Sequence, residues 1–479
     1  MGRVTAGWTL ASTLAIVSCS GAPGTGAIGA TSGTRLRAWV DDAGGGARRF
    51  VDWRDTQLGI DCSFRRTADG TLRCLDDAWA TIAYTDAACT DAVVLRYMPD
   101  DGGTHYVSSY DVTPITCAAP GGLGALGGLA GGAPALVTAV HLVGAPRAQP
   151  DMLFAPAAGA CTAWGTAGLA PRAASYASLA DEVSFDRFAA GTLVESPRAG
   201  GITLREIVSD DARQLMDFVR SDTHAPCRAS LMADGPRCIP PLVASEHTGV
   251  FGNATCTQPT ASATTVSAMC PQPTLLLRPS SSCGPEELRP LGDFTNSGFT
   301  LHGTDCVPTM LGSVGPAWYA GDPLTGAALD AAAPALRFGA IGSGRLRVAT
   351  TTDLDGALLA TGGLWEAPDG TACQTVGLPD HHVICGRFAF AGVLFSDAAC
   401  TVSVATSTSS SCDPAMPTAA YTTGSGELHA LAGPHTGATY QNVPGVGCVG
   451  SGSLGASALY VLGDVLPAST FPSIERVLD

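Results

Sequence analysis

A block of three cysteines occurs three times along this chain, and this repetition constrains the fold more than any other feature of the sequence. Each copy opens with an Arg/Thr-Leu-Arg run, continues to a closely spaced cysteine pair, and ends in an aromatic-x-Asp/Asn-x-x-Cys-Thr motif. Self-similarity at a long period indicates one structural unit that is used three times. The motif residues are Tyr84, Asp86 and Cys89, then Phe251, Asn253 and Cys256, then Phe395, Asp397 and Cys400.

Each closely spaced cysteine pair brackets a predicted β-hairpin. Asp69-Gly70 and Asp234-Gly235 stand near the centres of the first two bracketed segments, and Asp-Gly is a strong signal for a tight β-turn. Cysteines placed on the two strands of one hairpin lie close enough to be joined. We therefore predict disulfides within the three pairs Cys62/Cys74, Cys227/Cys238 and Cys373/Cys385.

The composition predicts an all-β fold. Short runs rich in Val, Thr, Tyr and Phe alternate with Gly, Asp and Pro, and only 14% of the residues are charged. The repeats are expected at residues 34–197, 198–341 and 342–479. Two arrangements fit them: a β-propeller of about six blades, closed by a terminal strand near Ile474–Leu478 that lies beside the first strand, or three consecutive small β domains.

The N-terminus has the layout of a bacterial signal peptide. One basic residue, Arg3, is followed by an apolar run that is too short to span a membrane. Ile16–Cys19 resembles a lipobox, in which the cysteine is diacylated and becomes the mature N-terminus; the alternative is an ordinary signal peptide with an accidental cysteine. We expect a signal peptide over residues 1–18, a lipidated Cys19 and a flexible tether over 19–33.

The residue after Cys19 gives the expected destination. An Asp there resembles an inner-membrane retention signal, whereas this chain has Ser20. The resemblance therefore implies an exported, outer-membrane lipoprotein, anchored through Cys19 to membrane lipid on the periplasmic or cell-surface face.

The cysteine count agrees with export. Seventeen cysteines become sixteen if Cys19 is lipidated, and an even number in an exported chain implies up to eight disulfides. The copies hold five, six and five cysteines, so the odd numbers in the outer copies predict at least one bridge between copies. No Cys-x-x-Cys pair occurs, which argues against a metal site built from thiolates.

Several function classes are disfavoured. The net charge of −16 and the scattered Arg residues argue against a nucleic-acid partner. The chain has no lysine, which excludes Schiff-base chemistry and the phosphate-binding P-loop. Gly-x-Gly-x-x-Gly strings at 122–127 and 450–455 lack the βαβ context of a nucleotide site. His381-His382 are interpreted as turn surface.

Two sets of acidic residues have a structural and a functional interpretation. Asp353 and Asp355 resemble the start of a calcium loop but lack the later Glu, so we expect an Asp-rich turn and no cofactor, with calcium as the weak alternative. The repeated Asp86, Asn253 and Asp397 are expected to cap a turn, with a repeated ligand contact as the alternative.

One aromatic position also recurs. Trp53, Phe218 and Trp365 precede the first hairpin cysteine of each copy. They are expected in the core, and the alternative is a surface on which sugars stack.

The lipobox, the Arg-Leu-Arg opening, the Asp-Gly hairpins and the cysteine motif together resemble a group of cysteine-rich tandem-repeat lipoproteins of myxobacteria that carry a domain of unknown function. The resemblance implies a fold but no activity. We therefore expect a non-enzymatic surface protein that binds a polysaccharide or a protein. The alternative is an exported propeller-type hydrolase that uses Asp/Glu carboxylates, with or without calcium.

Overall fold

The computed structural model describes residues 27–76, 80–96, 103–111, 136–157, 160–163, 175–240, 243–262, 274–279, 285–295, 297–310, 317–366, 371–378, 383–407, 417–422, 425–443, 447–451 and 458–479. The expected signal peptide, Cys19, residues 122–127 and His381-His382 lie outside the described residues, as does most of 450–455. Four further cysteines also lie outside them: Cys117, Cys270, Cys283 and Cys412.

The described chain is almost entirely β, and the all-β prediction is confirmed. Its regular helices are one short α-helix, α2 (Gly326–Ala332), and the 3-10 turns η3 (Phe185–Arg187), η4 (Ala199–Gly201) and η5 (Ala468–Thr470). The described strands fall into five sheets of 11, 7, 9, 4 and 7 strands. They do not form six four-stranded blades, so the propeller is not the arrangement that these residues adopt.

Two of the sheets make up the centre of the molecule. The first has, in spatial order, β1 (Ala30–Thr31), β15 (Ala212–Arg220), β14 (Ile202–Ser209), β13 (Ala190–Arg198), β5 (Leu72–Asp76), β4 (Ile60–Arg66), β3 (Arg48–Asp55), β2 (Leu36–Asp42), β38 (Ser473–Leu478), β30 (Val383–Gly386) and β29 (Gln374–Gly377). The second has β25 (Arg337–Ile341), β26 (Leu346–Thr352), β27 (Leu358–Glu366) and β28 (Thr371–Ala372).

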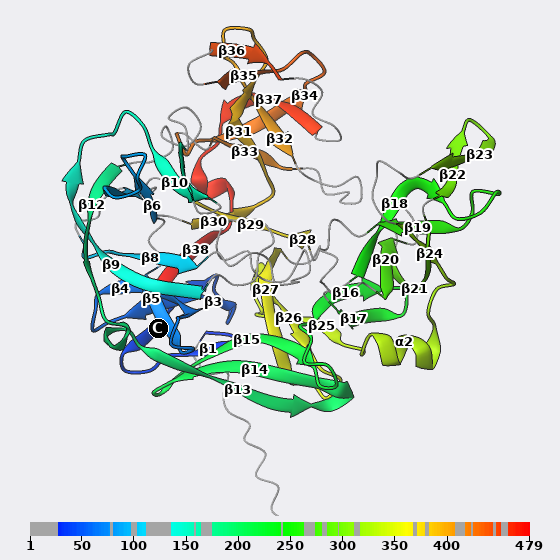
Figure 1. Ribbon diagram of the computed structural model, residues 1–479, viewed down its shortest axis with the longest axis horizontal. Coiled ribbons are helices and arrows are strands. Elements are labelled where there is room, and N and C mark those ends of the chain that lie inside the picture. The colour runs from blue at the N-terminus through cyan, green and yellow to red at the C-terminus, as the bar shows by residue number, and fades with distance from the viewer. Residues whose placement is uncertain are drawn as a thin grey trace, which may run out of the picture.

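Three lobes surround this centre, at the left, right and top of Figure 1. Lobe 1 contains β6 (Ala80–Tyr84), β7 (Ala92–Arg96), β8 (Tyr106–Asp111), β9 (Leu136–Arg147), β10 (Phe154–Ala157), β11 (Ala160–Ala163) and β12 (Ser175–Glu182). Lobe 2 contains β18 (Val243–Phe251), β19 (Pro259–Ser262), β20 (Leu275–Pro279), β21 (Glu286–Thr295), β22 (Ser297–His302), β23 (Asp305–Met310) and β24 (Ala317–Ala320), and it shares its sheet with β16 (Arg228–Met232) and β17 (Gly235–Ile239). Lobe 3 contains β31 (Phe388–Phe395), β32 (Ser403–Ser407), β33 (Ala419–Thr422), β34 (Leu428–Pro434), β35 (Tyr440–Val443), β36 (Gly447–Gly450) and β37 (Ala458–Val465).

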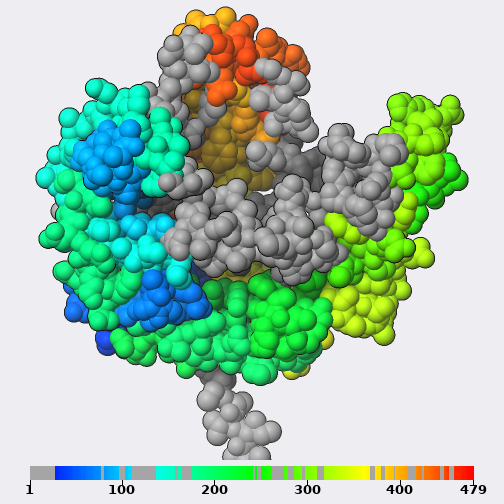
Figure 2. Space-filling view, viewed as in Figure 1, coloured from blue at the N-terminus to red at the C-terminus, as the bar shows by residue number. Residues whose placement is uncertain are grey.

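The central strands divide into three equivalent groups. We call β2–β5 unit 1, β14–β17 unit 2 and β26–β30 unit 3; each continues into the lobe of the same number. In the space-filling view the lobes project separately, lobe 2 most clearly at the upper right (Figure 2). Each lobe ends in a return strand, β13, β25 or β38, that leads back to the centre.

Each return strand joins two neighbouring units through the same hydrogen bond. The backbone N–H of the second hairpin cysteine donates to a carbonyl at the start of the return strand or just before it: Cys74 to Ala189 (2.9 Å), Cys238 to Pro334 (2.8 Å) and Cys385 to Pro472 (3.0 Å). The return strand then pairs with the first strand of the next unit, as β13 does with β14 and β25 with β26.

Units 3 and 1 are joined in the same way. The last strand, β38, pairs antiparallel with β2, and Trp39 lies opposite Leu478. The predicted position of the terminal strand beside the first is thus confirmed. Unit 3 contacts unit 1 as each earlier unit contacts its successor.

The N-terminal end of the described chain lies where the three units meet. The Ile28 N–H donates to the Arg48 carbonyl of β3 (2.8 Å), and the Leu215 N–H of β15 donates to the Gly29 carbonyl (2.7 Å). A Cβ on Gly29 would lie 3.1 Å from Cγ2 of Thr361 in β27, so only glycine fits without displacement. Residues 27–31 therefore contact the second strand of every unit. The expectation of a flexible tether through residue 33 is wrong for these residues, because Ala27 and Ala30 are buried.

Candidate functional site

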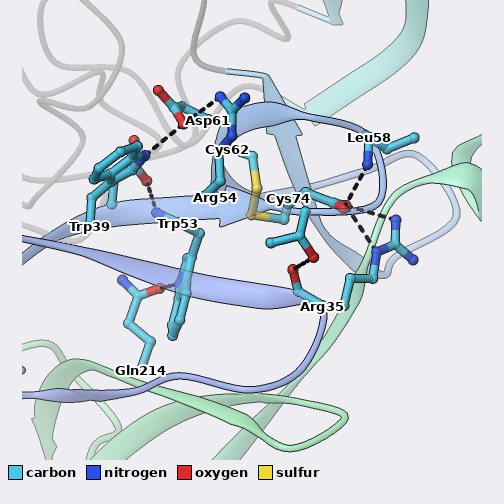
Figure 3. The surroundings of a disulfide bond; sticks show 12 residues. Arg35, Trp39, Trp53, Arg54, Leu58, Asp61, Cys62, Cys74 and Gln214 are labelled. Atoms are coloured by element: carbon cyan, nitrogen blue, oxygen red, sulfur yellow. Dashed lines mark hydrogen bonds and ion pairs between the residues drawn. A yellow bond between two sulfur atoms is a disulfide. The ribbon is translucent and has the colours of Figure 1, made fainter. Parts of the chain in front are cut away.

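The three predicted hairpin pairs are disulfides: Cys62–Cys74, Cys227–Cys238 and Cys373–Cys385. The bridged residues lie diagonally across the hairpins, since Cys74 is opposite Phe64 and Cys385 is opposite Thr375. The first bridge packs in the core of unit 1 (Figure 3). Both of its cysteines are fully buried.

The repeated aromatic position lies in the core in units 1 and 2. Trp53 is 1% exposed and donates its indole N–H to Gln214 (2.7 Å; Figure 3), and Phe218 is 3% exposed. The Phe218 carbonyl accepts the Cys227 N–H, and the equivalent acceptor in unit 3 is Leu364. Trp365 is thus one residue out of register and half-buried. Buried rings offer no face for a sugar, so Trp53 and Phe218 are structural.

Each lobe has a disulfide of its own, which uses the motif cysteine. The bridges are Cys89–Cys161, Cys256–Cys306 and Cys400–Cys448. All three motif cysteines have left-handed backbone conformations, with φ of 54°, 50° and 53°. A non-glycine residue seldom adopts this region unless the surroundings impose it. The disulfide and the cap described next hold the turn in this shape.

The motif Asp or Asn caps the turn identically in each lobe. Asp86 Oδ1 accepts the backbone N–H groups of Thr90 (2.8 Å) and Asp91 (2.9 Å). Asp397 Oδ1 accepts those of Thr401 and Val402 at 2.9 and 2.8 Å.

In lobe 2 the cap is Asn253, whose Oδ1 accepts from Thr257 (2.9 Å) and Gln258 (3.0 Å). We call these three elements the stapled turns. They consist of Asp86–Thr90, Asn253–Thr257 and Asp397–Thr401.

The caps of lobes 1 and 3 carry charge. The hydrogen bond from the Thr90 hydroxyl, and then the one from the Asp91 N–H, lowers the pKa of Asp86. The equivalent Thr401 and Val402 bonds lower the pKa of Asp397. Asn253 accepts the same two backbone N–H groups without a titratable group, and its amide donates to the Thr257 hydroxyl (2.8 Å). Within each turn the two residues after the cap are exposed, which places small side chains such as Ala87 and Ala88 at the tip.

The two weak calcium candidates, Asp353 and Asp355, differ in burial and in their contacts. Asp353 is 2% exposed, and its Oδ1 accepts the N–H groups of Asp355 (3.0 Å) and Ala357 (2.8 Å). Its carboxylate therefore caps the β26–β27 turn, while Asp355 is exposed. Among the described residues no three His, Cys, Asp or Glu side chains are grouped as metal ligands would be.

The three units meet through three equivalent contacts, in which the turn after the first strand of one unit faces the start of another. At the contact of units 2 and 1, the Thr34 N–H donates to Asp211 Oδ1 (2.9 Å). At the contact of units 1 and 3, the N–H of Ser343 donates to the Gly45 carbonyl (2.8 Å). At the contact of units 3 and 2, no hydrogen bond joins the described residues 353–357 to residues 199–201.

A groove of about 370 Å³ lies at this third contact. Its apolar lining comes from units 2 and 3 and from the N-terminal segment, and it includes Ala30, Leu204, Leu215 and Leu358. The pseudo-threefold arrangement is therefore broken at one place.

The groove has four polar lining residues: Thr31, Arg198, Glu206 and Arg213. Neither arginine forms an ion pair with any described residue, and both are exposed. Arg198 lies opposite Ile202 and Arg213 opposite Val208 on β14, which places them roughly 20 Å apart along the strand. The groove thus has an exposed arginine near each end, while two of its apolar lining residues, Ala30 and Leu204, are buried in the core.

A larger hollow, of about 620 Å³, lies beside the β16–β17 hairpin. Glu286 is its one charged lining residue. That carboxylate accepts a hydrogen bond from the Ser230 hydroxyl and lies 3.7 Å from Arg228. The charged side chain of this hollow is therefore already paired within the protein.

The family model described as "Family of unknown function (DUF7481)" matches residues 130–471. The chain belongs to this family. The DUF7481 match begins just before β9 and ends just before β38, so it covers units 2 and 3 and much of lobe 1. No curated protein matches the chain.

Two further observations concern where the DUF7481 chain works. Six disulfides within the described residues indicate an oxidising environment, because cytosolic reductants keep thiols reduced. No helix in the described part of the chain has the length and apolar character needed to cross a bilayer.

Proposed function

We propose that this chain is an exported, lipid-anchored, non-enzymatic surface protein that binds a polysaccharide or a protein through its three stapled turns. Diacylated Cys19 would attach it to outer-membrane lipid on the periplasmic or cell-surface face. The proposal includes kinship with the cysteine-rich tandem-repeat lipoproteins of myxobacteria. The net charge of −16 speaks against nucleic acid as the partner.

The observation that carries the proposal is that one turn geometry is built three times, on three separate lobes. Each turn has the same side-chain cap, a disulfide and the same pattern of exposure. A catalyst needs one site, whereas repeated rigid loops can contact a repetitive ligand several times. Several weak contacts then add to a high overall affinity.

The hydrolase alternative gains no support from the groove. Glycoside hydrolysis generally needs two carboxylates on either side of the scissile bond. The groove is lined by one, Glu206.

The binding test uses the mature chain with Cys19→Ser and envelope polysaccharide isolated from the producing bacterium. Ala87→Glu, Ala254→Glu and Ala398→Glu each add a bulky charge to one tip. We expect each single variant to weaken binding modestly and the triple variant to weaken it by at least a hundredfold. Ala340→Glu, at an exposed alanine on β25, is the control. Equal binding of the wild type and the triple variant would refute the proposal, and so would the release of new sugar ends.

The anchor is tested separately. Labelled palmitate should be incorporated into the wild-type chain and not into Cys19→Ser. Incorporation into both would refute lipidation at Cys19.

A further inference from the structure

We propose that residues 27–31 are a withdrawable strap that holds unit 2 against unit 3. The seated strap fills the junction of the three units, and its withdrawal opens the contact between β15 and β27. This device is separate from the stapled turns and does not require lipid at Cys19. Its basis is the position of the segment, its light attachment and the incomplete contact beside it.

The strap contacts one strand of each unit. The Ile28 N–H donates to the Arg48 carbonyl on β3 of unit 1 (2.8 Å). The Leu215 N–H on β15 of unit 2 donates to the Gly29 carbonyl (2.7 Å). On the side of unit 3, a Cβ on Gly29 would lie 3.1 Å from Cγ2 of Thr361 on β27. Three strands that are distant in the sequence thus converge on two neighbouring residues of the strap.

The side chains of the strap enter two different cores. Ala27 and Ala30 are buried in the cluster that contains Trp53 of unit 1. Ile28 instead packs against the cluster that contains Leu346 of unit 3. Burial of apolar side chains on both sides favours the seated strap in water.

The strap lies where the units are least joined to each other. The contact of units 2 and 1 is closed by a direct hydrogen bond from Thr34 to Asp211. At the contact of units 2 and 3, no hydrogen bond joins the described residues 353–357 to residues 199–201. The strap lies between β15 and β27 at this contact and supplies a link. Its withdrawal should therefore open this contact first.

The attachment of the strap is light enough to reverse. None of its five side chains carries a charge or a thiol, so they form neither ion pairs nor disulfides. Its pairing with β15 covers two residues. Segments held by few contacts open locally while the rest of a fold stays closed. The groove of about 370 Å³ gives the strap an open side, because four strap residues belong to its lining: Ala27, Gly29, Ala30 and Thr31.

Withdrawal of the strap would change the spacing of two stapled turns. Unit 2 continues into lobe 2 and unit 3 into lobe 3, so an open contact lets Asn253–Thr257 move relative to Asp397–Thr401. A ligand that contacts several turns depends on their spacing. This consequence rests on the proposed binding through the stapled turns, whereas the strap itself is tested without a ligand.

Native-state hydrogen exchange, followed by NMR, measures strap opening in the mature full-length chain with Cys19→Ser. The Ile28 and Leu215 amides lie in different parts of the chain, but strap withdrawal breaks both of their hydrogen bonds. We expect the two amides to share one protection factor, about tenfold or more below that of the Cys74 amide in the core of unit 1. Unrelated protection of Ile28 and Leu215, or protection as high as that of Cys74, would overturn the proposal.

A matched pair of variants removes the strap from its seat. In Gly29→Leu the new side chain meets Thr361. Gly70→Leu is the control, because φ is 81° at Gly70 and 87° at Gly29, and a Cβ on Gly70 meets nothing within 4 Å. Both variants therefore carry similar backbone strain, and only Gly29→Leu blocks the strap.

We expect Gly29→Leu to lower the protection of the β15 and β27 amides about tenfold and to leave the paired amides of β2 and β38 unchanged. Gly70→Leu should leave both sets unchanged. Equal protection of β15 and β27 in the two variants, or an equal loss of protection in β2 and β38, would contradict the strap. If Gly29→Leu does not fold, the comparison of Ile28 with Leu215 in the unsubstituted strap decides alone.

Discussion

Arg476 donates a hydrogen bond from Nε to Oδ1 of Asp41 (2.9 Å), joining β38 to β2. Asp41 is completely buried, and its other oxygen accepts from Arg49 at 2.6 Å. One carboxylate thus pairs with two cations at the seam between units 3 and 1. The contact between units 3 and 1 therefore contains a carboxylate that is removed from water and depends on these two arginines for its hydrogen bonds.

Asp41→Asn should therefore destabilise the fold substantially. The amide keeps the shape but presents a donor to one of the two arginines, and breaking a buried pair typically costs about 3–5 kcal/mol. Because the Arg49 and Arg476 side chains are partly exposed, we expect about 2–4 kcal/mol and a lower Tm. Calorimetry with disulfides intact measures this.

Asp61→Asn is the matched control for Asp41→Asn. Asp61 pairs with Arg54 at the surface, and its side chain is 53% exposed. Such a pair contributes at most about 1 kcal/mol. A Tm loss as large for Asp61→Asn as for Asp41→Asn would contradict the assigned role of the seam.

Gly33→Ala should open the contact between units 1 and 2. The added Cβ would lie 2.0 Å from Asp211 Oδ1 and displace the carboxylate that binds the Thr34 N–H. Overpacking of this kind typically costs about 1–3 kcal/mol. Gly363→Ala adds a methyl group to open space on β27 and should change stability by less than about 0.5 kcal/mol. Equal Tm values for the two variants would show that the contact is not tightly packed.

The stapled turns should differ in their response to acid. The folded-state pKa values of Asp86 and Asp397 lie below the ordinary value of 3.8, so these caps stabilise their turns above that pH. The stabilisation is lost as the pH falls below 3.8 through the lowered pKa values, when the carboxylates are protonated. Asn253 does not titrate. Between pH 6 and pH 2, the amide signals of Thr90 and Thr401 should shift in NMR spectra, whereas that of Thr257 should not.

Asn253→Asp provides the reciprocal variant for the acid response. It should make the Thr257 amide titrate like the other two. An amide of lobe 2 that titrates in the wild type, or none that titrates in the variant, would count against the shared cap geometry.

The disulfides should fall into two groups on mild reduction of the folded protein. Cys62 and Cys74 are fully buried, whereas the motif cysteines Cys89, Cys256 and Cys400 are half-buried. A thiolate reductant must reach the sulfur, so the lobe disulfides should open first and Cys62–Cys74 last. Alkylation followed by peptide mapping gives the order. Early loss of Cys62–Cys74 would contradict its buried position.

The same peptide mapping tests the cysteine count. The six disulfides of the described residues use twelve of the seventeen cysteines. Besides Cys19, the others are Cys117 in the first repeat, Cys270 and Cys283 in the second, and Cys412 in the third. The even count predicts that these four cysteines also form disulfides, with at least one bridge between repeats. Free thiols at these four positions in the oxidised protein would refute the pairing.

Features governed by local chemistry could be predicted from the sequence. The Asp69-Gly70 turn fixes a hairpin and thereby the Cys62–Cys74 pair, and the spacing from Asp86 to Thr90 fixes a side-chain cap. The pairing of β38 with β2 followed from the phase of the repeat. These signals lie within a few residues of each other or recur in register.

The groove and the N-terminal segment could not be predicted, because they depend on contacts between distant parts of the chain. Nothing around Ala30 distinguishes it from the Gly- and Ala-rich residues before it, yet it pairs with Gln214 on β15. The groove lies where no hydrogen bond joins the described β26–β27 turn to residues 199–201, and a contact between such distant segments has no local sequence motif. Trp365 shows the same limit of prediction from the sequence. The core position of unit 3 is Leu364, one residue before the aromatic residue that the repeat indicates.

The pairing of β38 with β2 also sets the order of assembly. A polypeptide is made from its N-terminus, so β2 exists long before residues 473–478 have been synthesised. Until then β2 presents an open edge, and such edges invite pairing with other chains. Asp41 and Asp42 of β2 lie opposite Arg49 and Arg48 of β3. These charged residues keep the unpaired edge of β2 polar. The six residues of β38 therefore cover this edge of β2 and end its exposure to such pairing.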